Sequence, residues 1–306
     1  RMTLHDAMRD ACDVVGVKVP RRNPVPGRWT ITDTNERNGN GDGRVLVFDN
    51  RQGGIVWNHQ TGQSAKFRLG GTETTKPDPK AAEEARARAK AREAEQAEVA
   101  RLCEAIVNAC RADHHDYLTA KGFPEERGLV LDHPQDLCPS TPFGREIAAA
   151  IPAAKPLLIV PGRIGGKVST VQFIAPDGTK KNIKHGHMAG ASHRVAQGRE
   201  TWVCEGIATA LSVRAGLRLL GRSATVLCAF AANNVAAVAK GIPGAFVAAD
   251  HDKPVPTLGG LGTGEYYAVA SGRSWVMPPA RGDFNDLHQA DGLRAVALAL
   301  RGIGMG

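Results

Sequence analysis

The chain has 306 residues, of which 42% are hydrophobic, and it carries a formal net charge of +8. This length allows one large or two modest domains, and the basic balance favours a polyanionic partner such as nucleic acid. No apolar run reaches the roughly 20 residues of a membrane-spanning helix, and no cysteine pair has the C-x-x-C spacing of a zinc ribbon. We therefore expect a reduced, cytoplasmic protein with no zinc, no signal peptide and no membrane partner.

Residues 1–76 are predicted to form a small α+β module. Apolar residues recur at helical spacing over residues 3–15, and short strand-like runs follow at 29–32, 45–48 and 55–57. The glycine-rich turn between the first two runs resembles half of a calcium loop, but a strand follows it where such a loop needs a helix, so a flexible hairpin loop is favoured. Basic and aromatic residues of this module are candidates for DNA contacts or for its core and rim: Arg21, Arg22, Arg28, Trp29 and Trp57.

The charged segment at residues 77–112 is predicted to be one long linking helix. Ala, Glu, Arg and Lys dominate its first half, whereas Val99, Leu102 and Ile106 add an apolar stripe to its second half. We expect the second half to dock on the next domain. The mixed charge signs favour a semi-rigid spacer over a basic helix that tracks nucleic acid.

Residues 113–197 are predicted to form a basic subdomain. A short helix is expected at 116–122, and strands are expected at 156–160 and 166–174. The glycine-rich stretch between these strands lacks the G-x-x-x-x-G-K-[ST] spacing of a P-loop, so no ATP-driven helicase motor is predicted. The basic residues here either hold a nucleotide or template or form an ordinary surface patch: Arg163, Lys180, Lys181, Lys184 and His185.

Residues 198–306 alternate between apolar strand-like runs and helical patterns. This alternation is typical of the α/β class, with a parallel sheet flanked by helices. The expected strands are 201–204, 225–230, 246–249 and 274–277, and the expected helices are 206–220, 233–240, 263–271 and 293–300.

Acidic residues follow two of these expected strands. Glu205 follows the first, and Asp250 and Asp252 follow the third. Ligands bind beyond the carboxyl ends of parallel strands, and alternate residues of an extended chain share a side, so both aspartates can face one ion. Carboxylates that converge in this way bind Mg²⁺ or Mn²⁺. Asp283 and Asp286 either add to this cluster or cap the last helix.

The same residues resemble the Toprim domain, a metal-binding fold shared by bacterial primases, topoisomerases and some nucleases. The Toprim pattern is a glutamate after the first strand and D-x-D after the third, here Glu205 and Asp250/Asp252. Segments 171–180, 203–211 and 282–288 are similar to those of plasmid and phage primases, including the TraC-like conjugative primases related to DnaG.

This resemblance implies a DNA primase that synthesises short RNA primers on single-stranded DNA from ribonucleoside triphosphates. Asp250 and Asp252 would bind the metal ions that hold the incoming triphosphate, and Glu205 would act as acid/base or as a metal ligand. Arg163 and Lys184 would match basic residues that face nucleotide and template. A stand-alone primase of plasmid, phage or mobile-element replication would also need a separate helicase or replication protein.

The N-terminal module departs from the DnaG-type pattern. Those primases carry a zinc ribbon for template recognition, and the cysteines of such a ribbon are absent from residues 1–76. Template recognition would therefore depend on other groups of this module.

Two other functions use the same residues. A Toprim nuclease would activate water in place of a hydroxyl, and a non-catalytic adaptor would bind DNA without chemistry. A topoisomerase is disfavoured because it needs a catalytic tyrosine outside the Toprim domain, and the chain has only three tyrosines.

Overall fold

The computed structural model describes residues 2–69 and 79–303, which form two compact units. The first unit comprises the chain up to Pro79 together with Pro254–Leu261, and the second comprises Lys80–Lys253 and Gly262–Gly306. The finer domain boundaries expected at residues 76, 112 and 197 stay predictions. No helix in the described ranges is long and apolar enough to cross a membrane.

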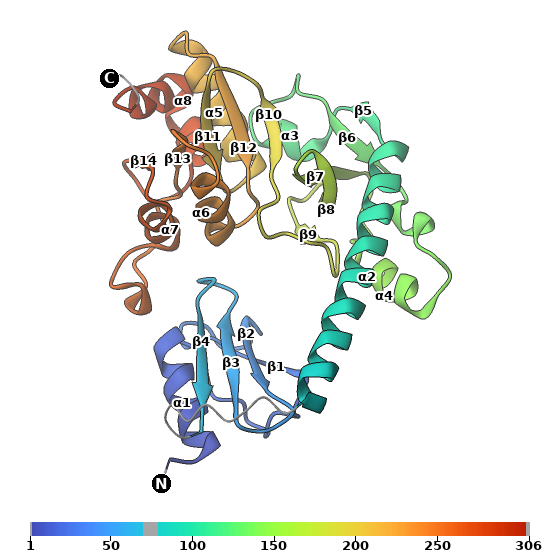
Figure 1. Ribbon diagram of the computed structural model, residues 1–306. Helices are drawn as coiled ribbons and strands as arrows, with labels where there is room; N and C mark the ends of the chain where they lie inside the picture. Colours follow the sequence, from blue (N-terminus) through green and yellow to red (C-terminus); the bar gives the residue numbers. More distant parts are fainter. Residues whose placement is uncertain (1, 70–78, 304–306) are drawn as a thin grey trace. The chain divides into compact units, whose positions relative to one another are not determined.

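The first unit is a four-stranded antiparallel sheet with one helix packed on it (Figure 1). Helix α1 (Leu4–Val15) begins at a capping box, in which the Thr3 hydroxyl accepts from Asp6 N at 3.1 Å and the Asp6 carboxylate accepts from Thr3 N at 3.0 Å. It ends at Gly16, whose φ of 67° is the left-handed value that favours glycine.

The sheet of this unit is a simple meander. Its strands are β1 (Trp29–Thr32), β2 (Gly43–Val47), β3 (Gly53–Asn58) and β4 (Ser64–Arg68), paired in that order. Strand β4 was not predicted, because only Ala65 and Phe67 of its five residues point inward and its apolar pattern is short. Val45, Val56 and Cys12 are fully buried between the sheet and α1.

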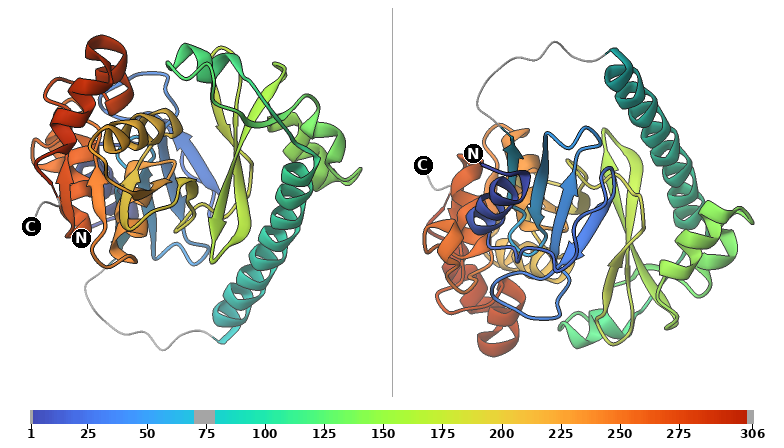
Figure 2. Two further views of the ribbon diagram at one scale, coloured as in Figure 1. Left: turned by 90° about the horizontal axis from the view of Figure 1, so that it is seen from above. Right: turned by 90° about the horizontal axis from the view of Figure 1, so that it is seen from below.

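Helix α2 (Pro79–Ala109) is the predicted linking helix, and it ends three residues before the expected boundary at 112. Residues beyond it form strand β5 (Arg111–Asp113) instead of a further helical turn. Val99, Cys103 and Ile106 are fully buried, so the second half of α2 docks on the sheet that follows it, as the apolar stripe predicts (Figures 1 and 2).

The second unit contains two sheets. The first is antiparallel and consists of β5, β6 (Gly128–Leu131), β7 (Leu157–Ile164), β8 (Lys167–Ile174) and β9 (Lys180–Asn182). It carries α3 (Asp116–Ala120), the 3₁₀ helix η1 (Pro134–Leu137) and α4 (Pro142–Ala150) in its connections.

The other sheet confirms the expected α/β class. Its strand order is β10-β12-β11-β13-β14, and all its strands run parallel except the edge strand β10. The strands are β10 (His193–Ala196), β11 (Glu200–Cys204), β12 (Ala224–Cys228), β13 (Phe246–Ala248) and β14 (Ser274–Val276).

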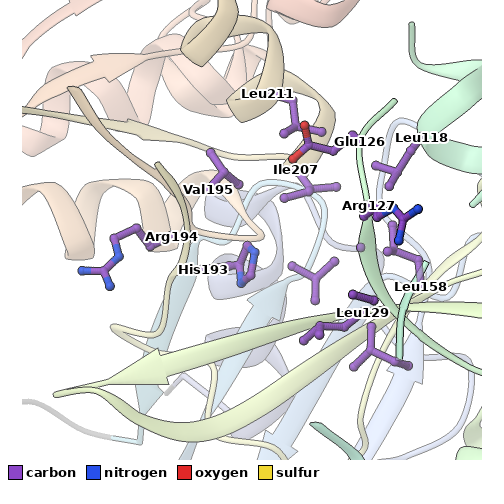
Figure 3. A pocket seen from close by; sticks show the side chains of 14 residues that line it. Leu118, Glu126, Arg127, Leu129, Leu158, His193, Arg194, Val195, Ile207 and Leu211 are labelled. Atoms are coloured by element: carbon purple, nitrogen blue, oxygen red, sulfur yellow. The ribbon is translucent and has the colours of Figure 1, made fainter. Parts of the chain in front are cut away.

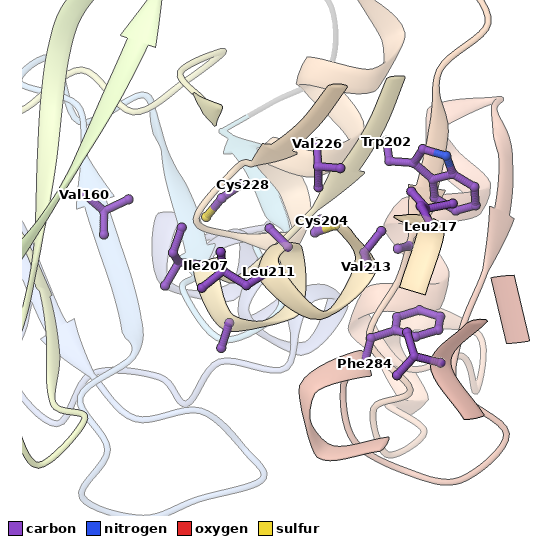
Figure 4. Close-up of a cluster of buried hydrophobic side chains, with 14 of the residues drawn as sticks. Val160, Trp202, Cys204, Ile207, Leu211, Val213, Leu217, Val226, Cys228 and Phe284 are labelled. Carbon is purple, nitrogen blue, oxygen red and sulfur yellow. The ribbon is translucent and has the colours of Figure 1, made fainter. Parts of the chain in front are cut away.

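Helices cover both faces of this sheet, and the alternation along β11 shows how. Trp202 and Cys204 point into a core shared with α5 (Ile207–Leu219) and α8 (Phe284–Leu300), part of which Figure 4 shows. Val203 points to the other face, into a core shared with α6 (Ala232–Lys240) and α7 (Thr263–Ser271). A strand that is buried on both faces is continuously apolar, which is why the sequence marked it clearly.

Helix α8 is longer than predicted. The sequence pattern indicates a helix from residue 293, but the element begins at Phe284 and consists of two helical segments that meet at Gly292, where φ is 79°. The 3₁₀ helix η2 (Pro256–Leu258) precedes α7 in the chain and lies in the segment Pro254–Leu261, which belongs to the first unit.

Candidate functional site

Two acidic residues lie next to each other at the carboxyl edge of the parallel sheet. Strand β11 ends at Cys204, which pairs in register with Ala248 of β13. Glu205 therefore leaves its strand beside the strand that leads to Asp250. Gly206 caps α5 without a side-chain hydrogen bond, so the first backbone N–H groups of that helix have no capping side chain.

The pKa values of these two carboxyls are raised. Burial raises the pKa of Glu205 to about 7, and the negative charges of Asp252 and Asp283 contribute to this rise, whereas Lys180 opposes it. Burial is also the largest cause that raises the pKa of Asp250 well above its usual range, and the negative charges of Glu205, Asp283 and Asp252 contribute after it. Four carboxylates thus act on one another at the partly buried carboxyl edge of the sheet, a pattern typical of functional sites. The edge that carries Glu205, Asp250, Asp252 and Asp283 is called the acidic crevice below.

Asp250 carries an unsatisfied acceptor. Its Oδ1 atom is buried and has no hydrogen-bond partner. Asp252, in contrast, is oriented by the start of α7, because its Oδ2 accepts from Gly264 N at 2.8 Å. A Cβ atom on Gly264 would lie 2.4 Å from Asp250 O, so only glycine allows this close approach of α7 to the acidic segment.

His251 lies between the two aspartates and points elsewhere. Its Nδ1 is 2.9 Å from Pro278 O, and its backbone pairs with Gly282 in an isolated bridge. This bridge brings the segment that begins α8 to the acidic crevice.

Asp283 and Asp286 form the capping box of α8. The Asp283 carboxylate accepts from Asn285 N at 2.6 Å and from Asp286 N at 3.0 Å, and the Asp286 carboxylate accepts from Asp283 N at 2.9 Å. The structure therefore shows the capping role that the sequence left open. Asp283 still contributes its negative charge to the crevice, whereas Asp286 is exposed at the surface.

The donor set of the crevice fits a hard divalent cation. Within residues 2–69 and 79–303, no three His, Cys, Asp or Glu side chains already converge at metal-binding distance. The unsatisfied Asp250 Oδ1, the mutual repulsion of the carboxylates and their oxygen-only chemistry are nevertheless what Mg²⁺ or Mn²⁺ would relieve.

Lys180 is the predicted basic residue that the structure places at the carboxylates. Its charge acts on both Glu205 and Asp250, and a Cβ on Gly206 would lie 4.0 Å from its Nζ atom. Its side chain is exposed along part of its length, and Nζ lies 5.4 Å from the centre of the Tyr117 ring. Lys180 thus holds a positive charge beside the N-terminus of α5.

The other predicted basic residues lie in different surroundings. Lys184 Nζ and His185 Nε2 contact Glu146 Oε1 of α4 at 2.5 and 3.2 Å. Lys181 is exposed on β9, and Arg163 of β7 is partly exposed and bridges the backbone of Ser192. The basic residues that the sequence groups into one patch therefore lie in several different environments.

Two residues that position the crevice were not predicted. Phe230, just after β12, has a φ of 70°, which is unusual for an aromatic residue, and its N–H donates to Glu205 O at 2.8 Å. Asn234 is buried and its Nδ2 donates to Ala191 O and Ala229 O, both at 2.8 Å. Neither residue belongs to a motif, so nothing in the sequence pattern marked them.

A separate cavity of about 260 Å³ lies inside the second unit, lined by β6, β7, β10 and α5 (Figure 3). His193 is one of its lining residues. The pKa of His193 is lowered to about 4, chiefly by burial; the hydrogen bond of Nδ1 to Pro161 O opposes this shift and the charge of Arg163 adds to it. Ile207 lines this cavity, but none of the crevice carboxylates does.

The candidate DNA-contacting residues belong to the first unit. Arg21, Arg22 and Arg28 are exposed before β1, and Trp29 is exposed on β1. Trp57 is partly exposed on β3, with its ring 6.5 Å from that of Trp29.

Comparison with known proteins identifies the acidic part of the chain. A family model described as the Toprim domain matches residues 200–293, which include Glu205, Asp250 and Asp252. Residues 200–293 form a Toprim domain. The Toprim match spans the whole parallel sheet except its antiparallel edge strand, β10.

One solved structure also resembles the chain. It is the primase fragment of the bacteriophage T7 primase-helicase protein, with 13% sequence identity and a TM-score of 0.36. The likeness covers 49% of this chain and 64% of that fragment, which is less than two thirds of its length. A TM-score this low does not establish a shared fold.

Proposed function

We propose that this protein is a DNA primase, which joins ribonucleotides into a short primer on single-stranded DNA by metal-dependent phosphoryl transfer. The observation that carries this proposal is the acidic crevice of the Toprim domain, where partly buried carboxylates repel one another and Asp250 Oδ1 has no hydrogen-bond partner. The similarity of segments 171–180, 203–211 and 282–288 to plasmid and phage primases supports this reaction over the other Toprim chemistries.

Each residue of the crevice has a role in the proposed reaction. Asp250 and Asp252 would hold Mg²⁺ or Mn²⁺, and Glu205, with a pKa of about 7, is suited to accept a proton near neutral pH or to complete the metal site. The bound cation would neutralise the negative charge of the triphosphate. Lys180 places a fixed positive charge beside the carboxylates, where it can pair with a phosphate oxygen.

Other basic groups would serve the template and nucleotide outside the crevice. Arg163 and Lys181 are accessible for phosphate contacts, whereas Lys184 and His185 would first have to leave Glu146. A separate helicase or replication protein would supply the unwound template in plasmid, phage or mobile-element replication.

A primer-synthesis assay tests the proposal. The chain is incubated with single-stranded DNA, labelled ribonucleoside triphosphates and Mg²⁺ or Mn²⁺, and the products are resolved by length. We expect short templated RNA from the wild type and at least a 100-fold loss with Asp250→Asn, because removal of one electrostatic group from a catalytic site costs about that much. Asp286→Asn, an exposed carboxylate of the α8 cap, is the matched control and should retain synthesis.

The alternatives have distinct outcomes in the same assay. Metal-dependent loss of the DNA, abolished by Asp250→Asn, would replace the primase assignment with a Toprim nuclease. DNA binding without products in either metal would indicate a non-catalytic adaptor. Synthesis that survives Asp250→Asn would contradict the assigned site.

A further inference from the structure

The sheet of the first unit has one face that no helix of this unit covers. Helix α1 packs against β3 and β4 on one side, where Val45, Val56 and Phe67 are buried. Because side chains of a strand alternate between faces, Trp29 and Ile31 lie on the opposite face, where they are 46% and 65% exposed. Large apolar side chains at this exposure call for an explanation.

The strand register groups the aromatic and basic residues of this open face. Ile31 pairs with Arg44, and Arg44 pairs with Trp57 across the next strand. Trp29 lies diagonally across from Trp57, with the ring centres 6.5 Å apart and the planes at 64°. The two indoles thus form one continuous aromatic patch.

The charges of the open face have a single sign. Arg44 of β2 and Lys66 and Arg68 of β4 share this face, as the alternation of buried and exposed residues shows. No carboxylate lies on this face of the four strands. Arg44 also donates to the backbone carbonyl of Gly43 at 2.9 Å, but no carboxylate of the four strands neutralises the three cations. Indole rings beside such cations are typical of sites for single-stranded nucleic acid, since bases stack on the rings and phosphates pair with the cations.

We propose that this open face binds single-stranded DNA, with bases stacked on Trp29 and Trp57 and phosphates held by Arg44, Lys66 and Arg68. The choice of DNA over RNA rests on the proposed primase function. The stacking itself rests on the geometry of the sheet alone. A protein partner is less favoured, because an apolar interface would leave these three cations desolvated and unpaired.

Tryptophan fluorescence of the full chain locates the binding site. The chain has four tryptophans, of which Trp202 is fully buried in the second unit. We expect (dT)12 to quench the wild-type emission, and the double variant Trp29→Phe/Trp57→Phe to lose most of this quenching. Trp275→Phe, which changes a tryptophan of the other unit, is the matched control and should keep it.

Affinity measurements test the energetic role of the face. Trp29→Ala should bind a labelled (dT)12 about tenfold more weakly, in line with ~1–3 kcal/mol for each stacked base. Arg68→Ala should reduce the slope of log affinity against log salt concentration by about 1, the value for one lost phosphate contact. Arg9→Ala, on α1 behind the sheet, should leave this slope unchanged. Thermal unfolding of each variant checks that the unit is folded.

Several results would overturn the proposal. Unchanged quenching in the double phenylalanine variant would show that the DNA binds at another site. Unchanged affinity of Trp29→Ala would show that the open face does not bind DNA and would favour a protein partner there. Equal or tighter binding of (rU)12 would contradict the choice of DNA. Asp250→Asn separates this proposal from the primase assignment, because it should abolish synthesis and leave (dT)12 quenching intact.

Discussion

Asp250 is a partly buried residue whose negative charge is poorly compensated by its surroundings. Its Oδ1 atom is buried without a partner. Burial raises the pKa of Asp250, the charges of Glu205, Asp283 and Asp252 raise it further, and Lys180 opposes the rise. An ionised group in such surroundings destabilises the fold unless a cation binds, and a loss of stability of this kind is typical of functional sites.

The substitution Asp250→Asn should therefore stabilise the metal-free protein. At pH 8 in EDTA, we expect the variant to unfold at a higher temperature than the wild type, with a gain of roughly 1–3 kcal/mol, because the repulsion with Glu205 is removed. Addition of Mg²⁺ should raise the wild-type unfolding temperature more than that of the variant. Differential scanning calorimetry measures both effects, and a lower stability of the variant in EDTA would contradict the assignment of uncompensated charge.

The sequence predicts the positions of Glu205 and Asp250 because both follow short apolar strands, and strand ends are readable from local pattern. It does not distinguish Lys180 from Lys184. Only the fold decides that the first lies by the carboxylates and that the second pairs with Glu146. The left-handed backbone of Phe230 is likewise a product of tertiary packing, since no local rule favours it.

At the scale of elements, an ion pair joins α5 to the segment before β6. Arg214 donates to both oxygens of Glu126, at 2.9 and 2.6 Å, and the side chains are only 12% and 31% exposed. The pair lowers the pKa of Glu126 through the hydrogen bonds from Arg214. A bidentate pair with this much burial fixes the relative position of its two elements more strongly than a surface pair does.

Removal of one partner should be costly. We expect Glu126→Gln to destabilise the second unit by roughly 2–4 kcal/mol, because the Arg214 charge is left buried without its counter-ion. The exposed pair of Arg111 with Asp132, at 50% and 42% exposure, provides the control: Asp132→Asn should cost much less stability than Glu126→Gln. Urea unfolding at pH 7 measures the stability of both variants. Equal losses of stability would show that the burial of an ion pair does not determine the cost of removing its carboxylate.

Strand β10 carries a pH-sensitive group. The pKa of His193 is lowered by burial to about 4, from 6.5, so the unfolded chain binds a proton more readily than the folded one. The contribution of neutral His193 to the free energy of unfolding is fully present above about pH 6.5. It is lost progressively as the pH falls toward 4, and the loss is at most roughly 3 kcal/mol. His193→Asn, which keeps a donor for Pro161 O, should flatten the stability curve between pH 6.5 and 4.5. A curve as steep as that of the wild type would indicate that other groups dominate acid unfolding.

Long elements with a clear apolar period could be predicted, and short or edge elements could not. Helices α1, α5, α6 and α7 lie within a few residues of their predicted positions. Strands β6 and β10 and helix α4 were missed. Their few inward-facing residues form too short a pattern, and their places in the sheets depend on neighbours distant in sequence.

The molecule as a whole has separate hydrophobic cores in its two units. Val56 is fully buried between α1 and the meander, and Val203 is fully buried between the parallel sheet and the helices α6 and α7. Chains with separate cores need not unfold in one transition.

Core substitutions should therefore act on one unit at a time. We expect Val56→Ala to destabilise the first unit by roughly 2 kcal/mol and Val203→Ala to destabilise the second by a similar amount. Hydrogen exchange followed by mass spectrometry should show faster exchange only in the unit that carries the change. Faster exchange throughout the chain from either substitution would mean that the units unfold together.

Two cysteine thiols lie behind the acidic crevice, and their low reactivity affects how the crevice responds to oxidants and soft metals. Cys204 and Cys228 end the neighbouring strands β11 and β12 and pair in register. Both are fully buried, and burial raises their pKa values, to about 12 for Cys228. At neutral pH they carry almost no thiolate, the form that peroxides attack and that soft metals such as cadmium bind. The crevice thus presents oxygen donors alone to solvent, which would leave it resistant to oxidants and heavy metals that inactivate thiol-lined sites.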